Sequence, residues 1–138
     1  MKYKNNPLNI RAGQDWLGLE TVNKGFCEFY TLDYGLRAAF CILRTYQIRG
    51  KLTLHDVIYT WAPPSENNSH SYLSFVADKT LFPSDWKLDV YSPVSVFRLI
   101  SSMCLFESQF TLGYESFDKG YKLFAFDGYF SPKDCFNL

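Results

Sequence analysis

A run of apolar residues at helical spacing between residues 32 and 48 limits the possible folds of this chain more than any other feature. The residues on the repeating face are Leu36, Ala39, Phe40, Ile42, Leu43, Tyr46 and Gln47. A period of about 3.6 residues is typical of a helix that buries one face. Gly50 follows, and glycine commonly ends a helix. The pattern therefore predicts a core helix over about residues 32–48.

Capping residues and prolines predict further helices. Thr53 followed by Asp56 is a typical helix start, and Pro63-Pro64 is a typical stop. Similar signals place helices at residues 53–61, about 68–79, about 93–107 and near 116–124. Residues 16–19 and 25–29 are expected to pair as a small hairpin, and a turn is expected at Asp127-Gly128. With no repeat or linker in the sequence, we predict one mainly α (α+β) domain over residues 1–138.

Charge and composition exclude some classes of protein. Fourteen basic and fourteen acidic residues cancel, which argues against a nucleic-acid partner bound through its phosphates. No stretch approaches the roughly 20 apolar residues of a membrane-spanning helix, and the N-terminus lacks the apolar run of a signal peptide. We therefore expect synthesis in the cytoplasm without a signal peptide. Aromatic residues make up 19% of the chain, and most are expected in the core, with any surplus available to line a groove.

The cysteines and histidines give no sign of a metal or cofactor. The four cysteines form no Cys-x-x-Cys pair, and Cys41 and Cys104 lie among apolar helical residues, where buried thiols are ordinary core. A zinc site using His55 or His70 is a minor alternative, because no ligand spacing supports it. No cofactor is expected.

The helix predicted at 93–107 ends at a carboxylate. Its apolar stripe consists of Val96, Leu99, Ile100, Met103 and Phe106 and leads directly to Glu107. A carboxyl group in surroundings of low dielectric keeps its proton at neutral pH and can pass it to a leaving group. The plainer alternative is a partly exposed glutamate at a helix C-terminus, where the helix dipole is slightly unfavourable to it.

Glu107-Ser108-Gln109-Phe110 has the form Glu-Ser-x-Phe and is similar to the catalytic glutamate motif of lytic transglycosylases and related lysozyme-like enzymes. In those enzymes the glutamate helix comes early, and a segment resembling residues 5–11 follows it. Here residues 5–11 come first and the glutamate helix comes last. The resemblance therefore implies a circularly permuted lysozyme-like domain.

A longer succession of motifs resembles small bacteriophage-associated proteins with a lysozyme-like fold, often labelled virion structural proteins. It covers about residues 4–80 and, more loosely, about 94–113. Its motifs are Asn5-Asn6-Pro7-x-Asn9-Ile10-Arg11, Trp16-x-Gly18, Phe26-x-x-Phe29, Asp33-Tyr34-Gly35-Leu36-Arg37-Ala38, Trp61-Ala62-Pro63-Pro64-Ser65-Glu66-Asn67 and Tyr72-x-x-x-Val76.

The resemblance implies a set of substrate-binding residues around Glu107. Asparagine and arginine side chains can donate to sugar hydroxyls and N-acetyl carbonyls, and an aromatic-led loop can line a sugar cleft. Each residue also has a plain structural interpretation: the asparagines as a turn, the tryptophan as buried core, the loop residues as solvated surface. The candidates are Asn6, Asn9, Arg11, Trp61, Glu66, Asn67, Tyr72 and Gln109.

The function implied is a peptidoglycan-cleaving lytic transglycosylase or muramidase that acts on the β-1,4 bond between N-acetylmuramic acid and N-acetylglucosamine. Glu107 would be general acid and base; a hydrolase would need a second carboxylate, for which Glu28 and Glu66 are the candidates. The alternatives are a non-catalytic virion or cell-wall-binding protein that keeps the fold, and an effector that reuses it. Expected partners are glycan strands and other virion proteins, at the cell wall or in a virion. The aromatic residues of the 125–138 tail are expected to pack against something.

Overall fold

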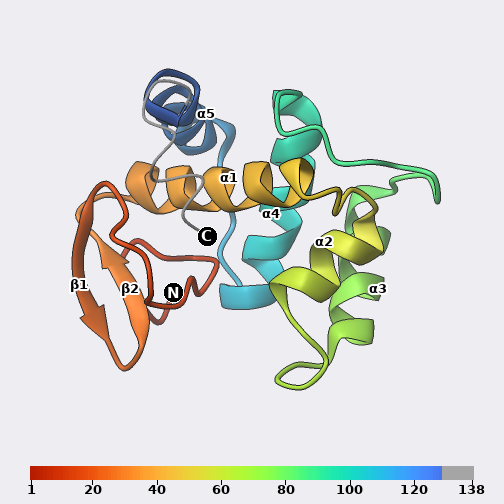
Figure 1. The fold of residues 1–138 in the computed structure, drawn as a ribbon, viewed down its shortest axis with the longest axis horizontal. Coiled ribbons are helices and arrows are strands. Elements are labelled where there is room, and N and C mark those ends of the chain that lie inside the picture. Colours follow the sequence, from red (N-terminus) through yellow and green to blue (C-terminus); the bar gives the residue numbers. More distant parts are fainter. Residues whose placement is uncertain (129–138) are drawn as a thin grey trace.

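The computed structural model describes residues 1–128, and Figure 1 shows the order and arrangement of their elements. Two antiparallel strands come first, β1 (Leu19–Asn23) and β2 (Phe26–Phe29). The α-helices that follow within these residues are α1 (Leu32–Ile48), α2 (Leu54–Trp61), α3 (Ser69–Thr80), α4 (Pro93–Ser108) and α5 (Tyr114–Leu123). A π-helical stretch, η1 (Phe124–Gly128), continues α5. The predicted mainly α class with a small β element is confirmed.

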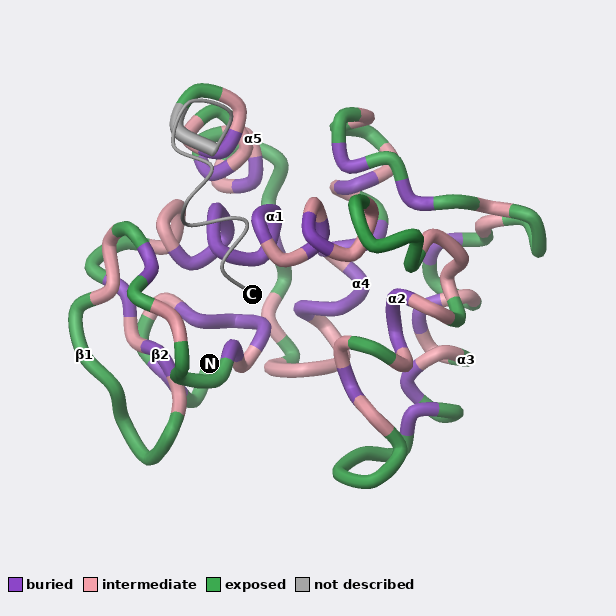
Figure 2. Tube along the Cα trace, in the orientation of Figure 1, coloured by how far each residue is buried: buried purple, intermediate pink, exposed green. Residues whose placement is uncertain are grey.

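Helix α1 lies across the middle of the molecule and carries the largest share of the core (Figures 1 and 2). Leu36, Phe40 and Leu43 are fully buried, as the helical spacing predicted. Helix α5 packs against α1, where the Phe40 ring meets Phe117 edge-on at 5.3 Å between centroids. Burial of one such side chain stabilises the fold by about 1.5–3 kcal/mol. The hairpin lies near one end of α1, and α2 and α3 lie near the other.

Side-chain caps fix the starts of α2 and α3. The Thr53 hydroxyl accepts a hydrogen bond from the backbone N–H of Asp56 at 3.0 Å, and the Asn68 side chain accepts one from Ser71 at 3.1 Å. Each bond satisfies one of the N–H groups that a helix start leaves without a partner. These starts are the ones that the sequence predicted.

The first strand of the hairpin begins later than predicted. Residues 16–18 form a turn instead, in which the backbone N–H of Leu19 donates to the Trp16 carbonyl at 3.0 Å. Gly18 makes this turn possible because it has a φ of +78° and packs against Tyr34, where a Cβ would lie 2.1 Å from the ring. The local glycine geometry therefore overrides the strand pattern expected at residues 16–19.

Two smaller differences lie near the C-terminus. Helix α5 begins at Tyr114, earlier than the expected residue 116, and the turn expected at Asp127-Gly128 belongs to η1, whose π-helical backbone prolongs α5. Phe126 is 69% exposed. The rest of the aromatic tail, residues 129–138, lies outside the described residues. Within residues 1–128, none of the helices combines the length and apolar character needed to cross a membrane.

The N-terminal segment, the residues that precede β1, is held between the hairpin and the end of α4. The Asn6 amide group donates to the carbonyls of Ile10 and Cys27 at 3.0 and 2.8 Å and accepts from the Ile10 N–H at 2.9 Å. The Ser108 hydroxyl donates to the Pro7 carbonyl at 2.7 Å. The Asn6 bonds hold the segment to itself and to β2, and the Ser108–Pro7 bond joins residues that are 101 positions apart and brings the N-terminal segment beside Glu107.

Candidate active site

The Glu107 carboxylate is the meeting point of four separate parts of the chain. Its Oε2 atom accepts hydrogen bonds from Trp61 Nε1 at 3.2 Å and from the Tyr72 hydroxyl at 3.0 Å. Its Oε1 atom accepts one from Asn9 Nδ2 at 3.1 Å, and the same amide nitrogen reaches the Glu107 backbone carbonyl at 3.3 Å. The side chain is half-buried, so the carboxylate is partly shielded from water without being sealed off.

Two of the three donors are placed by the end of a helix. Trp61 is the last residue of α2, and Tyr72 lies near the start of α3, four residues after the Asn68 cap. Asn9 has a φ of +52°, a left-handed conformation that asparagine tolerates better than most residues. The prolines that follow α2 and the Asn68 cap that begins α3 therefore direct Trp61 and Tyr72 toward Glu107.

The Tyr72 hydroxyl stays protonated over the physiological range. Burial raises the pKa of Tyr72 well above its ordinary value, and the charge of Glu107 raises that pKa further. The Trp61 indole and the Asn9 amide nitrogen have no acceptor atom, so they too face the carboxylate as donors. Oε1 accepts from Asn9 alone among the described residues, which leaves it a further acceptor position for a ligand.

Glu107 lines a cleft of about 760 Å³, within the range of roughly 300–1,000 Å³ typical of ligand sites. One wall comes from the N-terminal segment and β2, the other from the end of α2 and the loop that follows it, with residues of α1 between them. Aromatic residues from both walls line it: Tyr3, Trp16, Phe26, Tyr46 and Trp61. The cleft therefore combines the apolar faces of aromatic rings with polar side chains.

Most of the residues singled out from the sequence meet in this cleft. Its lining includes Glu107 and, among the predicted binding residues, Asn9, Arg11, Trp61, Glu66 and Asn67. Tyr72 is 2% exposed and contacts the carboxylate without lining the cleft, so it supports Glu107 instead of facing a ligand. Its ring stacks on Phe106 at 4.1 Å, which fixes the direction of the hydroxyl.

Two of the predicted binding residues lie elsewhere. Asn6 is fully buried, and its amide is engaged with the backbone of Ile10 and Cys27, so we assign it a structural role. Gln109 is exposed and does not line the cleft; it ends α4 in a left-handed conformation with a φ of +52°. Asn6 is not available to a ligand because its amide bonds to backbone groups. Gln109 lies outside the cleft because the left-handed backbone at the end of α4 directs its side chain elsewhere.

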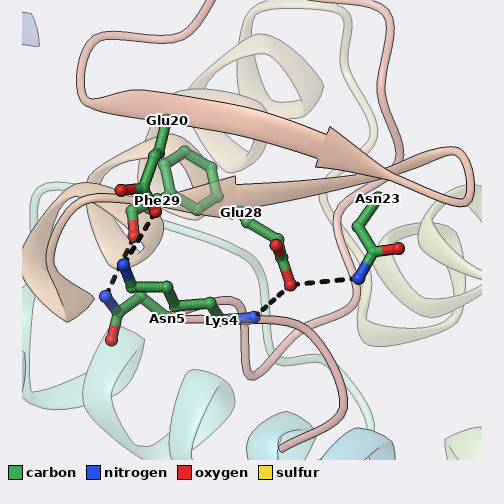
Figure 3. A network of polar contacts seen from close by, with 6 residues as sticks. All are labelled: Lys4, Asn5, Glu20, Asn23, Glu28 and Phe29. Atoms are coloured by element: carbon green, nitrogen blue, oxygen red, sulfur yellow. Dashed lines mark hydrogen bonds and ion pairs between the residues drawn. The ribbon is translucent and has the colours of Figure 1, made fainter.

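The two carboxylates named as possible partners of Glu107 have different places. Glu66 lines the cleft, is exposed, and pairs with Arg11 at 3.6 Å. Glu28 does not line it and belongs to a network on the hairpin with Lys4 and Asn23 (Figure 3). The Lys4 backbone N–H and the Asn23 side chain, which both donate to the Glu28 carboxylate, lower the pKa of Glu28.

Sequence reasoning did not single out Tyr46 as a site residue, although it lines the cleft. Its ring meets Trp61 edge-on, 6.5 Å between centroids, and burial raises the pKa of Tyr46 to about 12. Its position on the apolar stripe of α1 made it indistinguishable from core. Tyr3 and Phe26, which stack at 4.4 Å, were missed because no spacing links two aromatic residues so far apart in sequence.

Other chemistry in this part of the molecule is limited. Burial, and secondarily the charge of Glu107, raises the pKa of Cys104 to about 12, so that thiol is not a nucleophile at neutral pH. Among residues 1–128, no three histidine, cysteine, aspartate or glutamate side chains are grouped so that they could hold a metal ion.

Comparison with known proteins gives one relative of clear similarity. No protein-family model matches the chain. Protein P5 of Pseudoalteromonas phage PM2 is 35% identical to it over 125 residues, an alignment that covers 86% of this chain and 77% of that protein.

Proposed function

We propose that this chain, which belongs to the family of protein P5 of Pseudoalteromonas phage PM2, is a phage-type lytic transglycosylase that cleaves peptidoglycan. The observation that carries the proposal is the Glu107 carboxylate, held by three donors in an aromatic-walled cleft. The substrate bond is the β-1,4 linkage between N-acetylmuramic acid and N-acetylglucosamine. The protein acts at the cell wall or as part of a virion.

Glu107 acts first as general acid. With the glycan in the cleft, the proton on Oε1 passes to the glycosidic oxygen as the C1–O bond breaks. Trp61 and Tyr72 stay hydrogen-bonded to Oε2 and stabilise the carboxylate that forms. Glu107 then takes the proton of the sugar's 6-hydroxyl, whose oxygen bonds to C1 and closes an anhydro ring. The group ends the cycle protonated, and no water is consumed.

This route suits the residues available. A retaining or inverting hydrolase uses two carboxylates that flank the bond. Glu66 is the one other carboxylate among the described cleft residues, and it is exposed and paired with Arg11. A transglycosylase needs only the single glutamate.

We also propose that the arrangement is lysozyme-like and circularly permuted. In the resembling enzymes the asparagine-rich segment directly follows the glutamate helix. Here the bond from Ser108 to Pro7 and the bonds from Asn9 to Glu107 set the same two pieces side by side, although they lie at opposite ends of the described chain. This proximity supports a reordered chain around a similar site.

The second candidate is a non-catalytic phage or cell-wall-binding protein with the same cleft. One observation favours it: three donors on one carboxylate also make Glu107 a structural hub that joins the N-terminal segment, α2, α3 and α4. Such a hub would be retained even if the protein only bound glycan.

Digestion of purified sacculi separates the two candidates. Wild type should release muropeptides with anhydro ends, and Glu107→Gln should release none. Glu115→Gln is the matched control, because Glu115 is exposed on α5 and does not line the cleft. If wild type sediments with sacculi but releases no product, the proposed enzymatic activity is refuted and the binding protein is favoured.

A further inference from the structure

The cleft carries more positive than negative charge, in a chain whose net charge is zero. Among its described lining residues, Lys2, Arg11 and Arg49 are cationic, and Glu66 and Glu107 are acidic. When Glu107 holds its proton, as the proposed mechanism requires, the excess of positive charge grows. An excess of positive charge does not attract a neutral sugar polymer, whereas it does attract a polymer that carries carboxylates.

Arg11 is the cation whose position the structure fixes most clearly. Its guanidinium carbon lies 5.3 Å from the centroid of the Phe26 ring, and Phe26 is in turn stacked on Tyr3. A backbone bridge also pairs Arg11 with Phe26. This contact favours a position of the guanidinium on the cleft wall that does not depend on its ion pair.

The present partner of Arg11 is Glu66, on the opposite wall. The two side chains are 64% and 54% exposed, and the N···O distance of 3.6 Å is longer than the roughly 2.7–2.9 Å of a strong charge-assisted hydrogen bond. Exposed ion pairs of this kind contribute little and are easily exchanged. A ligand carboxylate that enters the cleft can take the place of Glu66.

We propose that Arg11 is a specificity residue that binds a carboxylate of the substrate, exchanging Glu66 for it. The inference rests on the proposed function and refines it: the substrate is a glycan strand that carries carboxylates, such as those of peptidoglycan's peptide stems, and not a neutral polymer of the same sugars. Glu66, in this account, competes with the substrate for Arg11.

The test compares native sacculi with sacculi whose carboxyl groups have been converted to amides. For wild type, amidation should raise KM about ten-fold, the size expected for the loss of one charge-assisted contact, with kcat little changed. Arg11→Gln should show that higher KM on native sacculi and no further response to amidation. Arg11→Lys should recover part of the loss. Glu66→Gln should lower KM about three-fold on native sacculi, because the competing carboxylate is gone.

Lys87→Gln is the matched control for charge, because Lys87 is exposed and does not line the cleft. It should behave as wild type on both preparations. If wild type cleaves native and amidated sacculi equally well, or if Arg11→Gln raises KM relative to wild type by the same factor on both preparations, the role of Arg11 is refuted while the proposed enzyme stands. If wild type cleaves neither preparation, the proposed function itself fails.

Discussion

Replacing Glu107 with glutamine and with alanine separates its chemical role from its structural one. Glutamine keeps the shape of the side chain and one acceptor oxygen. With that oxygen toward Trp61 and Tyr72, both of those bonds survive, and the new amide group faces Asn9. Asn9 can turn its amide over to match, because its Oδ1 is buried without a partner among the described residues. The turn gives up the longer bond, at 3.3 Å, from Asn9 to the Glu107 backbone carbonyl, and it brings the Asn9 Oδ1 atom close to that carbonyl oxygen.

The expected stability cost of Glu107→Gln is therefore about 1 kcal/mol, the net value of one ordinary hydrogen bond. Glu107→Ala removes the acceptor of three bonds and leaves the fully buried Tyr72 hydroxyl without its partner. At about 1 kcal/mol for each bond, because the carboxylate is half-exposed and water can enter, the cost is about 3 kcal/mol. For a chain of this length these costs correspond to falls in Tm of about 3 °C and about 10 °C.

The catalytic activities of the two variants should not follow their stabilities. Both variants lack the proton donor, so both should lose about 10²–10⁴-fold in kcat on sacculi. Differential scanning calorimetry and muropeptide release on the same preparations give both quantities. A Glu107→Gln protein that retains wild-type activity would refute the catalytic role. An alanine variant as stable as wild type would refute the hydrogen-bonded hub.

Four further outcomes are expected. Tyr72→Phe removes one donor to Glu107, so kcat should fall about ten-fold with KM within about two-fold of wild type, as initial rates will show. Gly35→Ala should cost about 3 kcal/mol in urea unfolding, because the new Cβ would lie 2.0 Å from the Asn5 carbonyl oxygen. The pKa of Glu28 is lower in the folded protein than its ordinary value of 4.5, so Glu28 stabilises the fold at pH values above 4.5, and this stabilisation is lost as the pH falls through the folded-state pKa. Urea titrations at pH 7 and about pH 3.5 should therefore show a larger fall in the free energy of unfolding for wild type than for Glu28→Gln. Calorimetry should give one cooperative transition if the chain is a single domain, and two transitions would contradict that prediction.

Local signals in the sequence predicted the helices well. The stripe of α1, the Thr53 and Asn68 caps and Pro93 at the start of α4 all act within a few residues of themselves, so a single sequence contains the information. The strand boundary failed where a tertiary contact decided it: Gly18 lies against Tyr34 in a left-handed turn, and no local pattern reveals that neighbour.

The site could be predicted only in part, for the same reason. Glu107 stood out because a carboxylate at the end of an apolar helix is unusual, and the motifs around Asn9 and Trp61 came from resemblance. Nothing in the sequence indicated that the Asn6 amide would bond to the backbone of Ile10 and Cys27, or that Tyr46 would line the cleft as well as pack against the core. Those assignments depend on which side of an element meets another, and that is set by packing between distant segments.

The central claim is that Glu107 delivers a proton to a glycosidic bond and then closes an anhydro ring without water. Digestion of sacculi in water labelled with heavy oxygen tests it most directly, with the released muropeptides weighed by mass spectrometry. The account predicts anhydro products that carry no heavy oxygen from wild type, and no products from Glu107→Gln. Heavy oxygen at the new chain ends, or the same products from Glu107→Gln, would contradict it.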